Sequence, residues 1–92
     1  MSRENSVEMP VAALVRRELL EGEHVIQSLE SGVYGVGDDW EEAERDFWNH
    51  MSDLHDFLDE LVRDGEATDY EVAELPLLAN RLKQRQLVVE AA

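Results

Sequence analysis

Residues 38–65 read DDWEEAERDFWNHMSDLHDFLDELVRDG, and this stretch decides the fold that we expect for the chain. Its apolar side chains recur every three to four residues, which is the spacing of one face of an α-helix. Asp38, followed three residues later by a glutamate, is typical of a helix start, and Gly65 is typical of the position after a helix end. We therefore expect a helix from about Asp39 to Asp64 with this core stripe: Trp40, Ala43, Phe47, Met51, Leu54, Leu58, Leu61 and Val62.

Four further side chains flank that stripe and widen its apolar face: Trp48, His50, His55 and Phe57. One facing helix does not need so wide a face, so the helix should have two neighbours. A chain of 92 residues supplies only short partner helices. We therefore expect self-association, as a homodimer, through Trp48 and Phe57.

The segment before this helix also repeats at helical spacing. Pro10 suits a first helical turn, and one stripe then contains Val11, Leu14, Val15, Leu19, Gly22, Val25, Ile26 and Leu29. We expect a helix from about Pro10 to Glu30. Glu18 lies on the same stripe, either at its margin or in a buried polar contact. The glycine-rich loop from Gly32 to Gly37 either folds back onto the helices or presents Tyr34 to a partner.

The segment after residue 65 predicts a third, shorter helix. Thr68 and Glu71 have the spacing of a capping box. Pro76 should interrupt the helix, since a proline ring clashes with the carbonyl four residues earlier. We expect a turn through about Glu74, a helix over residues 75–87 and a frayed tail over 88–92. The prediction is an all-α fold, a single three-helix bundle over residues 1–92, with a flexible segment at 1–9 and completion by dimerisation.

Composition narrows the class of protein. Apolar residues make up 43% of the chain, which is enough for a folded domain. The absence of cysteine excludes disulfides and thiolate metal sites and fits a reducing compartment. The N-terminal residues lack the apolar stretch of a signal peptide. We expect a soluble, cytoplasmic protein of phage or bacterial type.

The sequence offers little for catalysis. No serine lies in a recognisable nucleophile motif, and no glycine loop suits phosphate binding. His50 and His55 each share a helical face with an aspartate four residues away, but the two histidines project about 140° apart. The Glu-x-x-His spacing of di-iron bundles occurs only at Glu21 and His24. We expect a protein that is not an enzyme, with no catalytic residues, no cofactor and no metal.

Negative charge is concentrated in the middle of the chain. Twenty-two acidic residues against eight basic ones give a net charge of −14, and residues 38–69 alone carry −11. Such a field repels nucleic acid and anionic membranes. Acidic residues spaced by four on one helix destabilise it slightly. Adaptation to high salt would spread the acids over the surface, whereas residues 70–92 are neutral.

The acidic helix face therefore predicts a basic partner. Carboxylates three or four residues apart are about 4.5–6 Å apart along a helix axis, loosely comparable to a row of phosphates. Acidic mimics of nucleic acid, such as anti-restriction and anti-CRISPR proteins of phages, use this principle. We expect the chain to inhibit or regulate a basic, nucleic-acid-binding protein through Glu41, Glu42, Asp46, Asp53, Asp56, Asp59, Glu60 and Asp64. The alternative is a small subunit, adaptor or antitoxin-like partner that associates through apolar helix faces.

Overall fold

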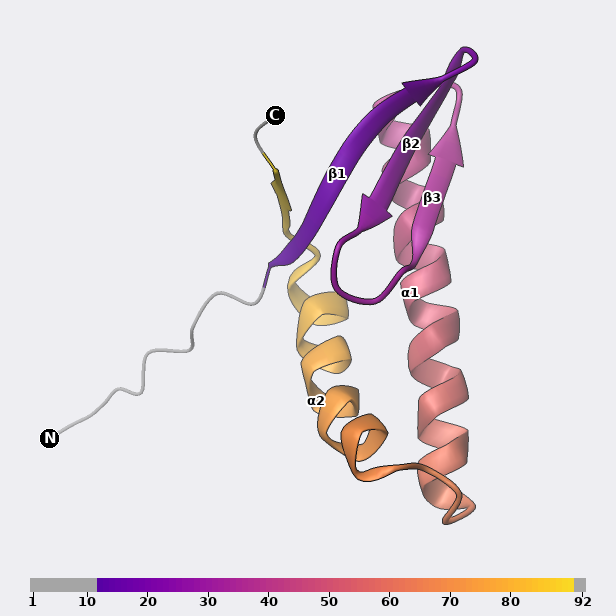
Figure 1. Ribbon diagram of the computed structural model, residues 1–92, viewed down its shortest axis with the longest axis vertical. Coiled ribbons are helices and arrows are strands. Elements are labelled where there is room, and N and C mark those ends of the chain that lie inside the picture. Colours follow the sequence, from indigo (N-terminus) through magenta and orange to yellow (C-terminus); the bar gives the residue numbers. More distant parts are fainter. Residues whose placement is uncertain (1–11, 91–92) are drawn as a thin grey trace, which may run out of the picture.

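The computed structural model describes residues 12–90, which form an α+β domain and not the expected three-helix bundle (Figure 1). A mixed sheet of four strands has the order β3-β2-β1-β4, in which β4 runs parallel to β1 and the other pairs are antiparallel. The elements in chain order are β1 (Ala13–Leu20), β2 (Glu23–Ser28), β3 (Tyr34–Gly37), α1 (Trp40–Arg63), α2 (Asp69–Gln84) and β4 (Leu87–Val89).

The predicted first helix is wrong, because residues 13–28 form the β1–β2 hairpin. Leu20 pairs with Glu23, so only Glu21 and Gly22 form the connection. Both residues have positive φ, at 52° and 86°. Positive φ at both central positions is the geometry of the two-residue turn that matches the twist of a hairpin. Gly22 therefore belongs to a turn and not to a helix contact.

The helices cover only part of the sheet, and this explains why the sequence of β1 lacks the alternation expected of a strand. Ala13, Val15 and Ile26 point to the helix side and are buried. Arg17 and Leu19 lie on the same side of β1 but remain exposed. The alternation of apolar and polar residues that marks a half-buried strand is therefore lost in the second half of β1. Glu18 points to the opposite side and is exposed.

The glycine-rich loop folds back onto the core, which resolves one alternative left by the sequence. Its second half is β3, an edge strand beside β2. A Cβ atom at Gly35 would collide with the backbone of Ala43 and Phe47, and one at Gly37 with the backbone of Ala43. The two glycines therefore allow β3 to lie directly on α1.

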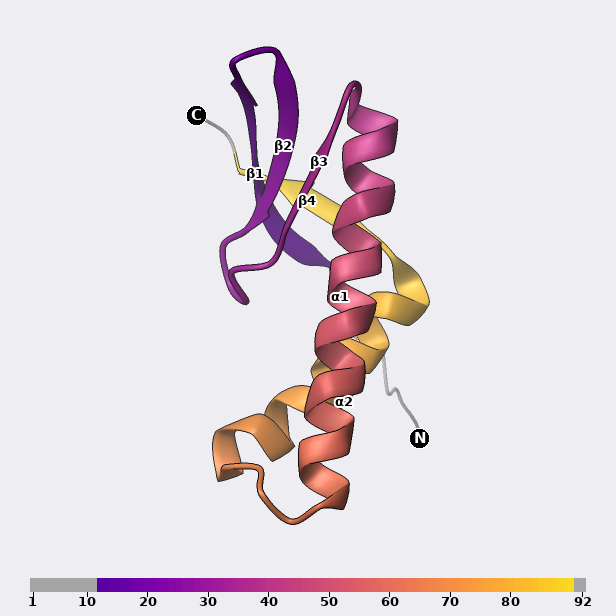
Figure 2. The same cartoon turned by 90° about the vertical axis from the view of Figure 1, so that its right-hand side faces the viewer.

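Helix α1 confirms the expected central helix, and its C-cap is Asp64. The N-cap is Asp39, one residue after the predicted Asp38, because the side chain of Asp39 accepts from Glu42 N–H. Its first half lies against the sheet, and its second half extends past the sheet and lies beside α2 (Figure 2). The core contains Ala43, Phe47, Met51 and Leu58 from the predicted stripe, with Trp40, Leu54 and Leu61 packed against it. Its other buried members are Ala13, Val15, Ile26, Trp48 and Leu78.

The last part of the chain differs from the prediction at two points. The capping box of Thr68 and Glu71 is present, but α2 is continuous from Asp69 to Gln84 with Pro76 inside it. Residues 87–89 form β4 instead of a frayed tail, since Glu90 N–H donates to Val15 O at 2.8 Å. The expected flexible segment 1–9, the helix start at Pro10 and the last two residues lie outside the described part of the chain.

Buried charge joins α2 to the sheet. Arg81 is only 9% exposed, and its guanidinium lies 3.2 Å from a Glu30 carboxylate oxygen and 3.6 Å from a Glu74 carboxylate oxygen. The other Glu30 oxygen accepts a hydrogen bond from Leu14 N–H at 3.2 Å. Glu30, two residues after the end of β2, therefore connects the first strand to the second helix.

Candidate functional site

The predicted acidic face of α1 separates into two parts in the structure. Its first part lies beside the sheet, and several of its carboxylates bond to the fold itself. Glu42 accepts a hydrogen bond from Asp38 N–H at 2.7 Å and donates its own N–H to the Asp39 side chain at 2.8 Å. Asp46 accepts from Val36 N–H at 2.9 Å, on the edge strand β3. These two acids stabilise the helix start and the sheet edge.

Two other members of the predicted set have neighbours of their own. Asp59 forms an ion pair with Arg63 at 3.0 Å. Glu41 lines a groove beside Trp40 and Arg17. Asp59 is thus paired within its own helix, and Glu41 lies at the margin of the acidic face.

The second part of the face has free carboxylates on the half of α1 that extends beyond the sheet. Asp53, Asp56, Glu60 and Asp64 are exposed there. Among the polar contacts of residues 12–90, only Asp56 has a side-chain partner, His55 Nδ1 at 3.5 Å. With a rise of 1.5 Å per residue, the row from Asp53 to Asp64 is about 16 Å long. We call these four residues the distal acidic row.

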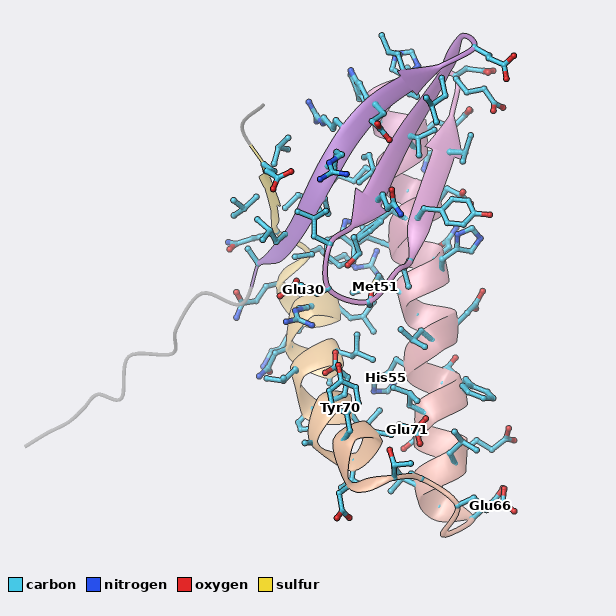
Figure 3. The ribbon with its side chains drawn as sticks, viewed as in Figure 1. Glu30, Met51, His55, Glu66, Tyr70 and Glu71 are labelled. Atoms are coloured by element: carbon cyan, nitrogen blue, oxygen red, sulfur yellow. The ribbon has the colours of Figure 1, made fainter. Side chains whose placement is uncertain are left out.

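Exposed acids continue beyond the distal acidic row to the far end of the helical hairpin. The predicted set of binding residues did not include these acids. Glu66 lies in the connection between the two helices, at the tip seen in Figure 3. Asp69, in the first turn of α2, is also exposed. Because sequence reasoning followed a single helix face, it could not place acids from the connection beside that face.

An exposed aromatic side chain lies within the distal acidic row. Phe57 is 56% exposed, and it is four residues after Asp53 and three before Glu60, so these side chains are neighbours on the helix surface. Trp48, the other residue expected in self-association, is 3% exposed and packs edge-on against Phe47. Trp48 therefore contributes to the core of its own chain and offers little area to a second copy.

A cleft between the two helices borders the acidic surface. It has a volume of about 270 Å³, and its walls include Glu30, Leu58, Tyr70, Glu71 and Glu74 (Figure 3). Tyr70 is 71% exposed at the mouth. The carboxylates already have partners: Glu30 and Glu74 contact Arg81, and Glu71 accepts from Thr68 N–H at 2.9 Å.

The histidines have structural contacts. His50 Nδ1 donates to Tyr34 O at 2.6 Å, and the His24 ring packs edge-on against Trp40 with centroids 4.6 Å apart. Over residues 12–90, no three His, Asp or Glu side chains are grouped so that they could hold a metal ion. In the same range, no helix is both long enough and apolar enough to cross a membrane.

Comparison of the chain with protein-family models, with curated proteins and with solved structures found no match.

Proposed function

We propose that the chain binds a basic protein through the distal acidic row and covers a surface of that protein that otherwise holds nucleic acid. The observation that carries this proposal is the set of free carboxylates around exposed Phe57, on the half of α1 without sheet cover. Complementary charge speeds association and selects the partner, and a buried aromatic ring is a frequent source of binding energy.

The contacts of the acidic face support a smaller binding surface than the whole face. Glu42 and Asp46 bond to the backbone of the fold, so their loss would alter the protein itself. Asp53, Asp56, Glu60 and Asp64 have no such role among the described contacts, and partner binding is the function left to them. The expected action is inhibition or regulation of the basic partner, without an enzymatic step.

The test is affinity capture of partner proteins on three immobilised proteins, from extracts of the native host or of an organism on which that host preys. They are the wild type, the triple variant Asp53→Lys, Asp56→Lys and Glu60→Lys, and a control with Glu18→Lys, Glu21→Lys and Glu23→Lys. Both variants change the charge equally, and the control residues are exposed on the β1–β2 hairpin. Circular dichroism shows whether each variant is folded.

The wild type and the hairpin control should retain a basic protein that elutes with rising salt and is displaced by DNA. The α1 variant should lose it, because like charges now face each other. Retention of the same partner by a folded α1 variant would show that the distal acidic row is only a solvated surface.

A second candidate is favoured by the open face of the sheet. Leu14, Leu20, Tyr34 and Val88 are exposed on the side opposite to α1. Exposed apolar groups gathered on one face are typical of interaction surfaces. In this case the chain is a small subunit, adaptor or antitoxin-like partner, and binding survives charge reversal on α1 but is lost with Leu20→Lys and Tyr34→Lys.

A further inference from the structure

A groove on the other side of α1 combines two indole rings with three arginines. It lies between the first half of α1, strand β1 and the C-terminal end of α2, and its volume is about 540 Å³. Arg17, Arg45 and Arg85 come from these three elements, and Trp40 and Trp48 complete the wall. This volume lies within the range of small-molecule sites.

The three arginines are unusual in so acidic a chain because they lack carboxylate partners. Arg16, Arg63 and Arg81 each form an ion pair. No acidic side chain within residues 12–90 is within ion-pair distance of Arg17, Arg45 or Arg85.

The groove arginines are positioned by other contacts. The Arg17 guanidinium lies over the Trp40 ring, 4.7 Å from its centroid. Arg85 donates from Nε to Leu82 O at 3.1 Å, so its two terminal nitrogens remain available. The guanidinium groups of Arg17 and Arg85 are thus held by contacts that involve no carboxylate of residues 12–90, and Arg45 lines the same groove.

A buried polar atom of the groove wall adds an independent observation. Trp48 is 3% exposed, and its Nε1–H has no hydrogen-bond acceptor in the described structure. Buried donors normally have an acceptor, so the Trp48 indole in the groove wall retains a hydrogen-bond donor that the described part of the fold does not use.

We propose that this groove binds a small aromatic oxyanion, a single carboxylate or phosphate carried by a flat ring. A guanidinium group matches both oxyanions with paired hydrogen bonds. A ring fits edge-on or offset against the indoles. Glu41 and Glu44 also line the groove. They leave it with a net charge of only +1 from its side chains, which favours one anionic group over a polyanion such as nucleic acid.

The chain has a built-in probe of this site. Its two tryptophans both line the groove, so the two indole N–H signals in a ¹H–¹⁵N NMR spectrum report on it. Benzoate and phenyl phosphate share a ring and differ in the oxyanion. Benzyl alcohol supplies the ring without charge, and inorganic phosphate supplies the charge without the ring.

At least one of the two aromatic oxyanions should shift the indole signals saturably, with a Kd of about 1 mM or tighter. Whichever binds more tightly identifies the oxyanion. Inorganic phosphate should bind more weakly, and benzyl alcohol should not saturate. Arg45→Gln should weaken binding about tenfold, through loss of a charged hydrogen bond. Arg63→Gln removes the same charge outside the groove and should leave binding unchanged.

Three results would overturn the proposal. The first is no saturable shift with either oxyanion. The second is a response of the indole signals to benzyl alcohol that equals their response to the aromatic oxyanions, or a loss of binding that is equal in Arg45→Gln and Arg63→Gln. The third is a change of the indole signals when the protein alone is diluted, with no response to the probes. This result would show that a second copy of the chain occupies the groove. None of these outcomes depends on the distal acidic row.

Discussion

At the scale of single residues, close backbone approach explains the glycines of β3. Gly35 is buried, and α1 passes so near that no side chain fits between the two backbones. Gly32 has open space around it, and its positive φ of 79° is what favours glycine there. The same residue type thus has two different physical roles three positions apart.

Gly35→Ala should destabilise the protein by about 3 kcal/mol, because the added methyl group forces β3 away from α1. Gly32→Ala is the matched change, and it should cost only about 1 kcal/mol for its positive φ. Urea unfolding followed by tryptophan fluorescence measures both. Equal losses for the two variants would contradict the close contact of β3 and α1.

The buried ion pairs of Arg81 should matter more than an exposed one. Arg81→Met leaves Glu30 and Glu74 without their cation, at a cost of about 2 kcal/mol after allowance for the partial exposure of Glu30. Arg16→Met removes the exposed pair with Glu90 and should cost less than about 1 kcal/mol. Thermal unfolding of the two variants provides the comparison, and a larger loss for Arg16→Met would refute it.

At the scale of elements, the central helix was predictable and the hairpin was not. The stripe of α1 packs against both sheet and helix, so its period survives along its length. In β1 the inward positions of Arg17 and Leu19 stay exposed, and the spacing of Leu14, Val15, Leu19 and Gly22 imitates a helix. β4 has three residues, too few for a visible period, and it pairs with a strand more than 70 residues away in the sequence.

The sequence predicted only the part of the candidate site that lies on a helix face. A helix face can be read from spacing, so the distal acidic row was included in the predicted set. The bond of Asp46 to the sheet edge could not be predicted from the sequence, since no strand was expected there. The groove of Arg17, Arg45 and Arg85 joins three elements that only the tertiary fold brings together.

The β1–β2 turn offers a test at this scale. Glu21 has φ of 52°, which costs most residues about 1 kcal/mol, whereas asparagine accepts it readily. Glu21→Asn should therefore stabilise the protein by about 0.5 kcal/mol. Glu23→Asn makes the same chemical change inside β2 and should not stabilise it. A gain for Glu23→Asn alone would contradict the turn assignment, as read from urea midpoints.

At the scale of the whole molecule, the net charge of −14 acts on stability as well as on binding. Self-repulsion of like charges favours the expanded state, and salt reduces it. The distal acidic row contributes strongly, because its carboxylates lie on one half-helix with Arg63 as the nearby cation. The positively lined groove shows that charge is not uniform over the molecule.

Unfolding temperature should therefore rise with NaCl and flatten once the screening length falls to about 8 Å, near 0.15 M. In the variant with Asp53→Lys, Asp56→Lys and Glu60→Lys, each change adds two positive charges, so the net charge becomes −8. Its salt response should be clearly smaller than that of the wild type, and its stability at low salt should be higher.

The hairpin control also reaches −8, yet its exposed acids lie near Arg16 and Arg17, so it should retain more of the salt response. Identical salt curves for the two variants, both different from that of the wild type, would mean that total charge alone sets the repulsion. Identical curves for all three proteins would mean that repulsion between these acids does not limit the stability. A rise that continues well above 0.5 M would instead indicate general salt adaptation of the chain, which weakens the case for a dedicated acidic binding face.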